Sequence, residues 1–151
     1  MTSLIGKLVS KTEVTSSPDA LYDIFAHKPY QLVSVAPDLF PTFDLLDGLW
    51  GVIGVVFSAT YLEDGKIKSE KATVVAMDDA NKSVTFLIIG GDPLTSYSTF
   101  SATFQAGIEN GKNIVTWTID YVKLLPTTPD PTSFMNVAIN AVKVIDANLP
   151  K

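Results

Sequence analysis

The stretch Asp47-Gly48-Leu49-Trp50-Gly51-Val52-Ile53-Gly54-Val55-Val56-Phe57 decides how this sequence folds. Its glycines stand three residues apart and lead directly into a β-branched apolar run. The spacing resembles a phosphate loop, but no Lys-Ser or Lys-Thr pair follows to meet phosphate and magnesium, and no helical pattern follows to supply a dipole. Glycine also lets the backbone bend sharply between two strands at the edge of a curved sheet. We therefore interpret the stretch as a glycine turn between strands.

The composition predicts one domain, residues 1–151, with more apolar side chain than an ordinary core needs. Apolar residues make up 46% of the chain and charged residues 18%, and the mean hydropathy is +0.26. The chain has no cysteine, which excludes disulfides, thiol catalysis and cysteine-bound metal. His27 is the sole histidine, which excludes a histidine-rich metal site. We therefore expect no metal and no cofactor.

Charge and hydropathy also limit the partners and the location. The net charge of −5 argues against nucleic acid, which attracts basic surfaces. No window approaches the roughly 18 uninterrupted apolar residues of a membrane span. Residues 1–7 lack the charged start and long apolar block of a secretory signal. We expect a cytoplasmic protein without a membrane span, present as a monomer or weak dimer.

Hydrophobic periodicity predicts a chain that is mostly strand. Ser17 and Pro18 are the expected N-cap and first residue of a helix that ends at Lys28-Pro29, and a second short helix is expected over 30–36. Closely spaced strands require antiparallel hairpins, because parallel crossovers need a dozen or more residues. The expected strands are 4–15, 39–46, 52–62, 66–78, 83–90, 97–108 and 113–124, and the expected long helix is 133–148.

This order predicts an α+β fold in which a curved seven-stranded antiparallel sheet meets a long C-terminal helix. One face of that helix is apolar, and Asn136, Asn140 and Lys143 lie on the opposite face. The apolar face consists of Phe134, Val137, Ala138, Ala141 and Ile145.

Three strands carry apolar residues at the alternate positions that are expected to face the interior of the sheet. Two interpretations of these residues are open. The residues are Val84, Phe86 and Ile88, then Phe100, Ala102 and Phe104, then Trp117, Ile119 and Tyr121. They either fill a core or line an apolar cavity between sheet and helix, and periodicity does not separate the two.

Four segments in this order resemble the major latex protein branch of the plant birch-pollen-allergen superfamily, which includes pathogenesis-related class ten proteins. They are Asp47–Gly54, Asn81–Phe86, Trp117–Tyr121 and Pro129–Ser133. The resemblance covers nearly the whole chain. It implies a helix-grip fold with a large internal cavity for small hydrophobic plant metabolites. Most relatives are regarded as carriers or as defence and stress proteins. Some are enzymes of specialised metabolism, including norcoclaurine synthase, isomerases of alkaloid pathways and a major-latex-protein-like nepetalactol cyclase, so the fold does not fix the function.

The sequence departs from the branch in ways that make the implied site apolar. Tyr30-Gln31 stands where the branch leads us to expect a histidine pair. Ala72 and Val75 stand where relatives often carry acids, Val52 and Val55 stand where Thr and Ser are usual, and Gly90 stands where an acid is common.

Few polar groups are left as catalytic candidates. They are His27, Tyr30, Ser58 and Tyr121. Each also has an ordinary structural explanation: a histidine at a helix C-terminus favours the dipole, and a tyrosine hydroxyl often caps a core. Lys71 and Lys123 have roughly the parity that Schiff-base chemistry would need, but both lie towards strand ends, where we expect solvated side chains.

The expected ligand-binding residues come from the inward strand positions, the first helix and the last helix. They are Phe25, Val56, Ser69, Val84, Phe86, Ile88, Tyr97, Phe100, Ala102, Phe104, Trp117, Ile119, Phe134, Val137, Ala138 and Ala141. Two functions follow. One is a cofactor-free cyclase or isomerase that folds a reactive terpenoid or polyketide-like intermediate mainly by shape, supported by a few hydrogen bonds. The resemblance to the nepetalactol cyclase implies iridoid (monoterpenoid) metabolism, with an activated enol of a monoterpene dialdehyde as the substrate. The other is a non-catalytic carrier or sensor of hydrophobic metabolites or hormones.

Overall fold

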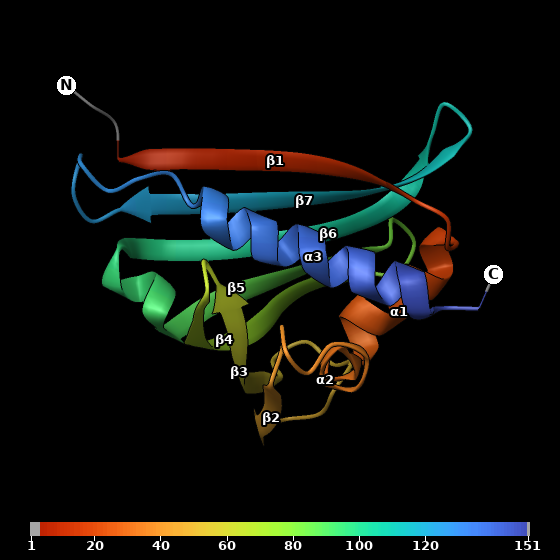
Figure 1. Ribbon diagram of the computed structural model, residues 1–151, viewed down its shortest axis with the longest axis horizontal. Helices are drawn as coiled ribbons and strands as arrows, with labels where there is room; N and C mark the ends of the chain where they lie inside the picture. The colour runs from red at the N-terminus through yellow and green to blue at the C-terminus, as the bar shows by residue number, and fades with distance from the viewer. Residues whose placement is uncertain (1–3, 151) are drawn as a thin grey trace.

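The computed structural model describes residues 4–150 and confirms the predicted α+β fold. Within these residues, seven strands form one antiparallel sheet in the order β1-β7-β6-β5-β4-β3-β2. The sheet curves around α3 (Thr132–Asn148), and α1 (Pro18–His27) and α2 (Gln31–Val35) lie at one end of it (Figure 1). The strands are β1 (Ile5–Val14), β2 (Thr42–Asp47), β3 (Val56–Glu63), β4 (Lys66–Asp78), β5 (Ser83–Gly91), β6 (Tyr97–Glu109) and β7 (Lys112–Lys123). A short 3-10 helix, η1 (Asp92–Thr95), joins β5 to β6.

Helix α1 begins and ends where the sequence predicts. The Ser17 hydroxyl accepts a hydrogen bond from the backbone N–H of Ala20 at 3.1 Å, and Pro18 is the first helical residue. Such a cap satisfies one of the N–H groups that a helix start leaves without a partner. Lys28 closes the helix, because Pro29 disfavours helical geometry in the residue before it.

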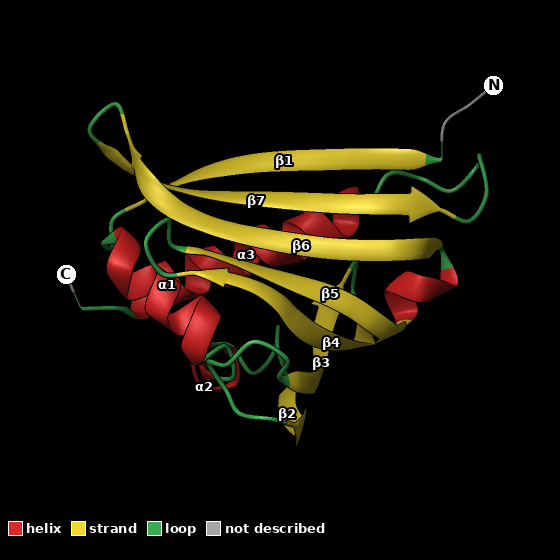
Figure 2. Cartoon of the chain, turned by 180° about the vertical axis from the view of Figure 1, so that it is seen from behind, coloured by secondary structure: helices red, strands yellow, loops and turns green. Residues whose placement is uncertain are grey.

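Helix α3 lies along the sheet with its apolar face inward. Seen from behind, the long strands β1, β7 and β6 pass in front of the helix (Figure 2). Asn136, Asn140 and Lys143 are exposed, as the sequence predicts, and Met135 and Val142 widen the buried face. The far end of the helix is tied to the start of α1, because the Asp146 carboxylate accepts the backbone N–H groups of residues 15 and 16.

The glycine turn corrects one strand boundary. Strand β3 begins at Val56 and not at residue 52, because Gly48, Gly51 and Gly54 all adopt left-handed backbone angles, with φ of 78°, 84° and 96°. A chain bent this way at three positions cannot extend into a ladder. A side chain at Gly51 would place its Cβ 3.2 Å from the His27 ring, so the turn lies directly against the end of α1.

The start of β2 is also later than predicted, at residue 42 and not 39. The backbone N–H groups of Leu39 and Phe40 both donate to the Ala36 carbonyl. These bonds form a turn after α2, so regular pairing with β3 begins only at Thr42, although the Leu39 carbonyl still accepts a hydrogen bond from the backbone N–H of Leu62. Phe40 instead turns its ring into the interior, where it is 4% exposed.

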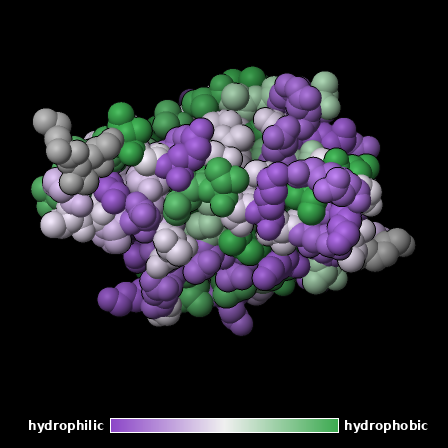
Figure 3. All heavy atoms as spheres, turned by 90° about the horizontal axis from the view of Figure 1, so that it is seen from above, coloured by the Kyte–Doolittle hydropathy of each residue, from purple (hydrophilic) through white to green (hydrophobic). Residues whose placement is uncertain are grey.

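The outer surface mixes hydrophilic and hydrophobic side chains. On the face seen from above, hydrophobic groups are interspersed with hydrophilic ones, and several hydrophobic groups adjoin along the upper edge (Figure 3). Between residues 4 and 150, the structure contains no helix with the length and apolar character needed to cross a membrane.

Candidate ligand-binding site

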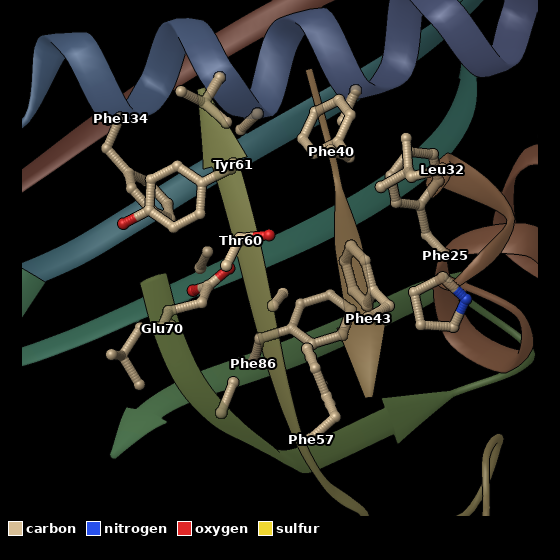
Figure 4. A pocket seen from close by; sticks show the side chains of 18 of the residues that line it. Phe25, Leu32, Phe40, Phe43, Phe57, Thr60, Tyr61, Glu70, Phe86 and Phe134 are labelled. Atoms are coloured by element: carbon tan, nitrogen blue, oxygen red, sulfur yellow. The ribbon is translucent and has the colours of Figure 1, made fainter. Parts of the chain in front are cut away.

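An apolar cavity lies between α3 and the concave face of the sheet (Figure 4). Its volume is about 90 Å³. Ligand sites for drug-sized molecules measure about 300–1,000 Å³, so the cavity is smaller than the resemblance implies. Its walls are Phe25, Pro29, Leu32, Phe40, Phe43, Phe57, Ala59, Thr60, Tyr61, Glu70, Ala72, Phe86, Ile88, Ala102, Trp117, Phe134, Val137, Ala138 and Ala141.

Aromatic rings in mutual contact form the wall beneath α2. Phe57 stacks on Phe43 at 5.5 Å and meets Phe86 edge-on at 6.1 Å between ring centroids. Trp50 belongs to the glycine turn. Its ring centroid lies 5.4 Å from the ring centroids of both Phe57 and Tyr30. Offset and edge-on pairs of this kind add to the stabilisation from burial. The glycine turn thus supports the cavity wall from outside.

Among the residues that the structure describes, Glu70 is the one acid in the cavity lining. It lies on β4, and its carboxyl group is directed towards the interior (Figure 4). No hydrogen bond or ion pair of this carboxyl is found among residues 4–150. Burial raises the pKa of Glu70 from 4.5 to about 7, with a further contribution from the charge of Glu63. At neutral pH this group exists in both its protonated and its ionised form.

The sequence contains a signal for Glu70 that our prediction did not use. Along β4, Glu70 shares parity with Ala72 and Val74, which are 1% and 2% exposed. In the register it pairs with Ala59, which is also buried. An acid in phase with buried residues on a strand is expected to point into the interior.

Two further polar atoms in the cavity wall have no hydrogen-bond partner within residues 4–150. They are the Tyr61 hydroxyl and the Trp117 indole nitrogen, both fully buried and without a hydrogen bond. Leaving a buried donor unpaired costs about 1–3 kcal/mol. A ligand oxygen that accepts either hydrogen bond would recover part of that cost.

A second hollow, the outer cleft, opens at the N-terminal end of α3. Its volume is about 470 Å³. It is lined by Tyr61, Glu63, Asp64, Lys68, Asp92, Pro93, Thr95, Ser96, Tyr97, Phe100, Pro129, Asp130, Pro131, Thr132, Ser133 and Phe134.

Many of the expected ligand-binding residues line the cavity, and the others lie in three different places. The lining contains Phe25, Phe86, Ile88, Ala102, Trp117, Phe134, Val137, Ala138 and Ala141. Tyr97 and Phe100 line the outer cleft instead. Val56 and Ser69 occupy the strand positions between the inward-facing residues, and they line neither hollow.

The remaining expected residues, Val84, Phe104 and Ile119, are 0% exposed and belong to the packed core. Phe25 of α1 stacks on Phe104 at 4.7 Å. Helix α1 therefore fills this half of the sheet, and for these positions the core-filling interpretation is correct.

The expected catalytic residues do not line the cavity. His27 Nδ1 lies 2.8 Å from the Asp23 carboxylate, on the outer side of α1. Tyr30 packs on the glycine turn and is 39% exposed. Ser58 has the outward parity of β3. The Tyr121 hydroxyl donates to Asp130 at 2.7 Å, and burial together with this bond raises the pKa of Tyr121 to about 12.

The lysines also lie away from the cavity. Lys71 is exposed, as predicted. The Lys123 side chain is only 17% exposed and forms an ion pair with Asp130 at 3.1 Å, because the β7–α3 loop folds over it. The expectation of a solvated Lys123 was therefore wrong. No lysine lines the cavity among the residues that the structure describes.

Several cavity residues were not predicted at all. Leu32 lies in the short helix α2 and Phe43 in the short strand β2, where few residues are available to show a period, and Phe40 lies in the turn between them. Phe57, Ala59 and Tyr61 alternate along β3 and could have been found from that alternation.

Comparison with known proteins identifies the family. The model of the pathogenesis-related protein Bet v 1 family matches residues 3–151. MLP-like protein 28 of Arabidopsis thaliana is 30% identical over 149 residues, and the match covers 97% of this chain but only 44% of that relative. The chain thus spans less than half the length of this relative.

Solved structures agree with that assignment. The crystal structure of ginseng major latex-like protein 151 from Panax ginseng has a TM-score of 0.93 and 31% identity, covering 97% of this chain and 99% of that one. Norcoclaurine synthase from Thalictrum flavum, in complex with dopamine and hydroxybenzaldehyde, has a TM-score of 0.74, covering 99% of this chain and 91% of that one. At 16% identity the second likeness shows the fold alone. The chain therefore belongs to the Bet v 1 family, in its major latex protein-like branch.

Proposed function

We propose that this protein binds a small hydrophobic metabolite in the cavity and catalyses its isomerisation or cyclisation without a cofactor. The observation that supports this proposal is the Glu70 carboxyl, which faces an otherwise apolar cavity with a pKa of about 7. A general acid or base works best when its pKa lies near the working pH. Isomerisation and cyclisation rearrange bonds within one molecule, so one carboxyl can take a proton from one substrate atom and return it to another.

The apolar walls supply the other part of the proposed catalysis. Rings such as Phe57, Phe86 and Trp117 can hold a flexible substrate in the folded shape from which it reacts. They also exclude water that would quench a reactive enol. In line with the family resemblance, we propose the enol of a monoterpene dialdehyde as substrate and a nepetalactol-type product.

The experiment is to generate that enol in solution and to measure the rate and stereochemistry of its cyclisation with and without protein. With protein present, one stereoisomer should dominate, and the cyclisation rate should depend on pH with a midpoint at about pH 7. Glu70→Gln should lower the rate by about 10²-fold or more and abolish that pH dependence. Glu13→Gln, which changes an exposed acid paired with Lys112, is the control and should behave like the unaltered protein. Equal product ratios with and without an excess of protein would rule out catalysis.

A carrier function is the second candidate, and it has its own supporting observation. The hydroxyl of Tyr121 and the ring of His27 already have partners in the fold, so they are not available to a substrate. A single carboxyl in an apolar cavity can simply hold a ligand oxygen by a hydrogen bond. Saturable binding of the metabolite with an unchanged product ratio would favour this function.

The shape of the cavity should determine which isomer forms. Trp117→Ala removes a ring from the wall, and the larger space should admit other folded conformers of the substrate. We expect a mixed product from this variant, as measured by chiral gas chromatography. Val84→Ala is the matched control, because Val84 is equally buried but does not line the cavity. If the product stays pure in the Trp117 variant, the wall does not select the conformer.

A further inference from the structure

Two aromatic side chains separate the cavity from the outer cleft. Tyr61 of β3 and Phe134 of α3 line both hollows. Their rings meet edge-on, with centroids 5.5 Å apart. We call this pair the partition. On one side of it lie about 90 Å³ of apolar space, and on the other about 470 Å³ of open cleft.

The cavity is too small for the proposed ligand unless a wall moves. An apolar cavity of about 150 Å³ is needed to hold a molecule as small as benzene. Most walls of the cavity are backed by the core, where Phe104 and Ile119 are 0% exposed. Behind the partition there is free volume instead. Turning the side chains of Tyr61 and Phe134 would join the two spaces and would open the contact of Phe134 with Phe100, whose ring centroids lie 4.8 Å apart.

The Tyr61 hydroxyl indicates that the outer cleft receives part of a ligand. Tyr61 is 2% exposed, and its hydroxyl has no hydrogen-bond partner. The hydroxyl points to the Phe134 side, away from the end of the cavity where Leu32 and Phe25 lie (Figure 4). The charge of Glu70 in the cavity lining acts on it, and so do the charges of Glu63 and Asp92 in the cleft lining. An unpaired donor is thus held at the boundary between apolar and polar space.

The charge of the outer cleft selects the class of polar group. Among residues 4–150, its lining carries four carboxylates, Glu63, Asp64, Asp92 and Asp130, and one lysine, Lys68. Lys123, outside the lining, forms an ion pair with Asp130 at 3.1 Å, so Asp64 and Asp92 are the carboxylates that no lysine in the described part of the chain pairs with. Lys68 is bound to Glu63 at 2.8 Å. An anionic group placed here would meet repulsion from carboxylates, whereas a neutral or cationic group would not.

We infer that the binding site extends through the partition into the outer cleft and takes an amphipathic ligand. The apolar end of the ligand lies in the cavity, and its polar end, neutral or cationic but not carboxylate, lies in the outer cleft. This inference rests on the proposed binding of a hydrophobic metabolite and adds the orientation and the charge class of that ligand.

Three probes with the same chain and different head groups test the charge class: 1-octanol, octylammonium and octanoate, titrated by calorimetry at about pH 7.5. Octanoate should bind about tenfold or more weakly than octanol, and octylammonium at least as tightly as octanol. In the double variant Asp64→Asn and Asp92→Asn, the affinity for octanoate should come close to the affinity for octanol. Both substitutions keep an oxygen to accept the bonds from Ser133 and from the backbone of Ser69. Asp19→Asn, far away in the first turn of α1, is the control. This variant should keep the full difference in affinity between octanol and octanoate.

Glu70→Gln locates the head group. If the polar end of the ligand lies in the outer cleft, this variant should keep the difference in affinity between octanoate and octanol. If Glu70→Gln removes the difference and the cleft variant does not, the head group lies inside the cavity and the inference is wrong. Equal affinity of all three probes for the unaltered protein would also overturn it.

Phe134→Ala tests the partition directly. Removing this ring should raise the association rate constant of octanol several-fold in stopped-flow measurements, because the barrier between the two spaces is reduced. Val137→Ala, which enlarges the cavity but is not part of the partition, should leave that rate unchanged. Equal rates in both variants would overturn the role of the partition. If octanol binds to neither the unaltered protein nor Phe134→Ala, hydrophobic ligand binding and the proposed function fail together.

Discussion

Glu70→Gln is expected to make the protein about 3 kcal/mol more stable at about pH 8 while changing little at about pH 4. In the folded protein the pKa of Glu70 is about 7, above its ordinary value of 4.5. Below about pH 4.5 the carboxyl is protonated in both the folded and the unfolded chain, and it then contributes no pH dependence. As the pH rises to about 7, the unfolded chain releases this proton while the folded chain retains it, so the free energy of unfolding falls. Glutamine is neutral throughout and removes that fall.

Urea unfolding at a series of pH values, for the unaltered protein and the variant, measures this difference. Subtracting one curve from the other isolates Glu70 from the acids whose pKa the fold lowers, such as Asp23 and Asp130. The exposed-acid variant Glu13→Gln is again the control. Its curve of unfolding free energy against pH should run parallel to that of the unaltered protein. If the Glu70 variant also runs parallel, the carboxyl is hydrated in the folded protein, and the basis for its catalytic role is lost.

Phe104→Ala should destabilise the protein by about 3–5 kcal/mol. Phe104 is 0% exposed, stacks on Phe25 at 4.7 Å and meets the Trp117 ring at 5.5 Å. Its removal leaves a void between α1 and the sheet, and both neighbouring rings lose contact at once. Thermal unfolding followed by circular dichroism gives the value.

Ile108→Ala on the same strand is the matched control. Ile108 is 66% exposed, so its truncation should change the free energy of unfolding by less than about 1 kcal/mol. Similar losses for the two variants would mean that the half of the sheet beneath α1 is not the rigid part of the molecule.

The sequence predicted the architecture well because its signals are local. Ser17 before Pro18 defines the start of a helix, and Asn110-Gly111 defines a hairpin. Errors arose where local preference and backbone geometry disagree. The β-branched side chains of residues 52–55 predict a strand, but the glycine turn bends the backbone there and regular strand geometry begins only at Val56. Gly54 and Val55 still form backbone hydrogen bonds with Val74 of β4.

The site was harder to predict because parity gives the face of a sheet but not what covers it. Phe104 and Phe86 have the same inward parity, yet α1 covers the first and leaves the second beside the cavity. Only the three-dimensional arrangement separates them. Glu70 could have been predicted from its parity, whereas the closeness of Tyr61 to Phe134 could not, since these residues lie on elements far apart in the sequence.

The pairing of β1 with β7 has a consequence for how the chain is made. Residues 5–14 leave the ribosome first, but their partners in the sheet are residues 113–122. At a synthesis rate of about 5–20 residues per second, the first strand waits for several seconds before any partner exists. The last helix is needed as well, because Asp146 binds the end of that strand. The pairing of β1 therefore cannot form until residues 113–122 have been made, and such distant pairing is typical of domains that fold over milliseconds to seconds.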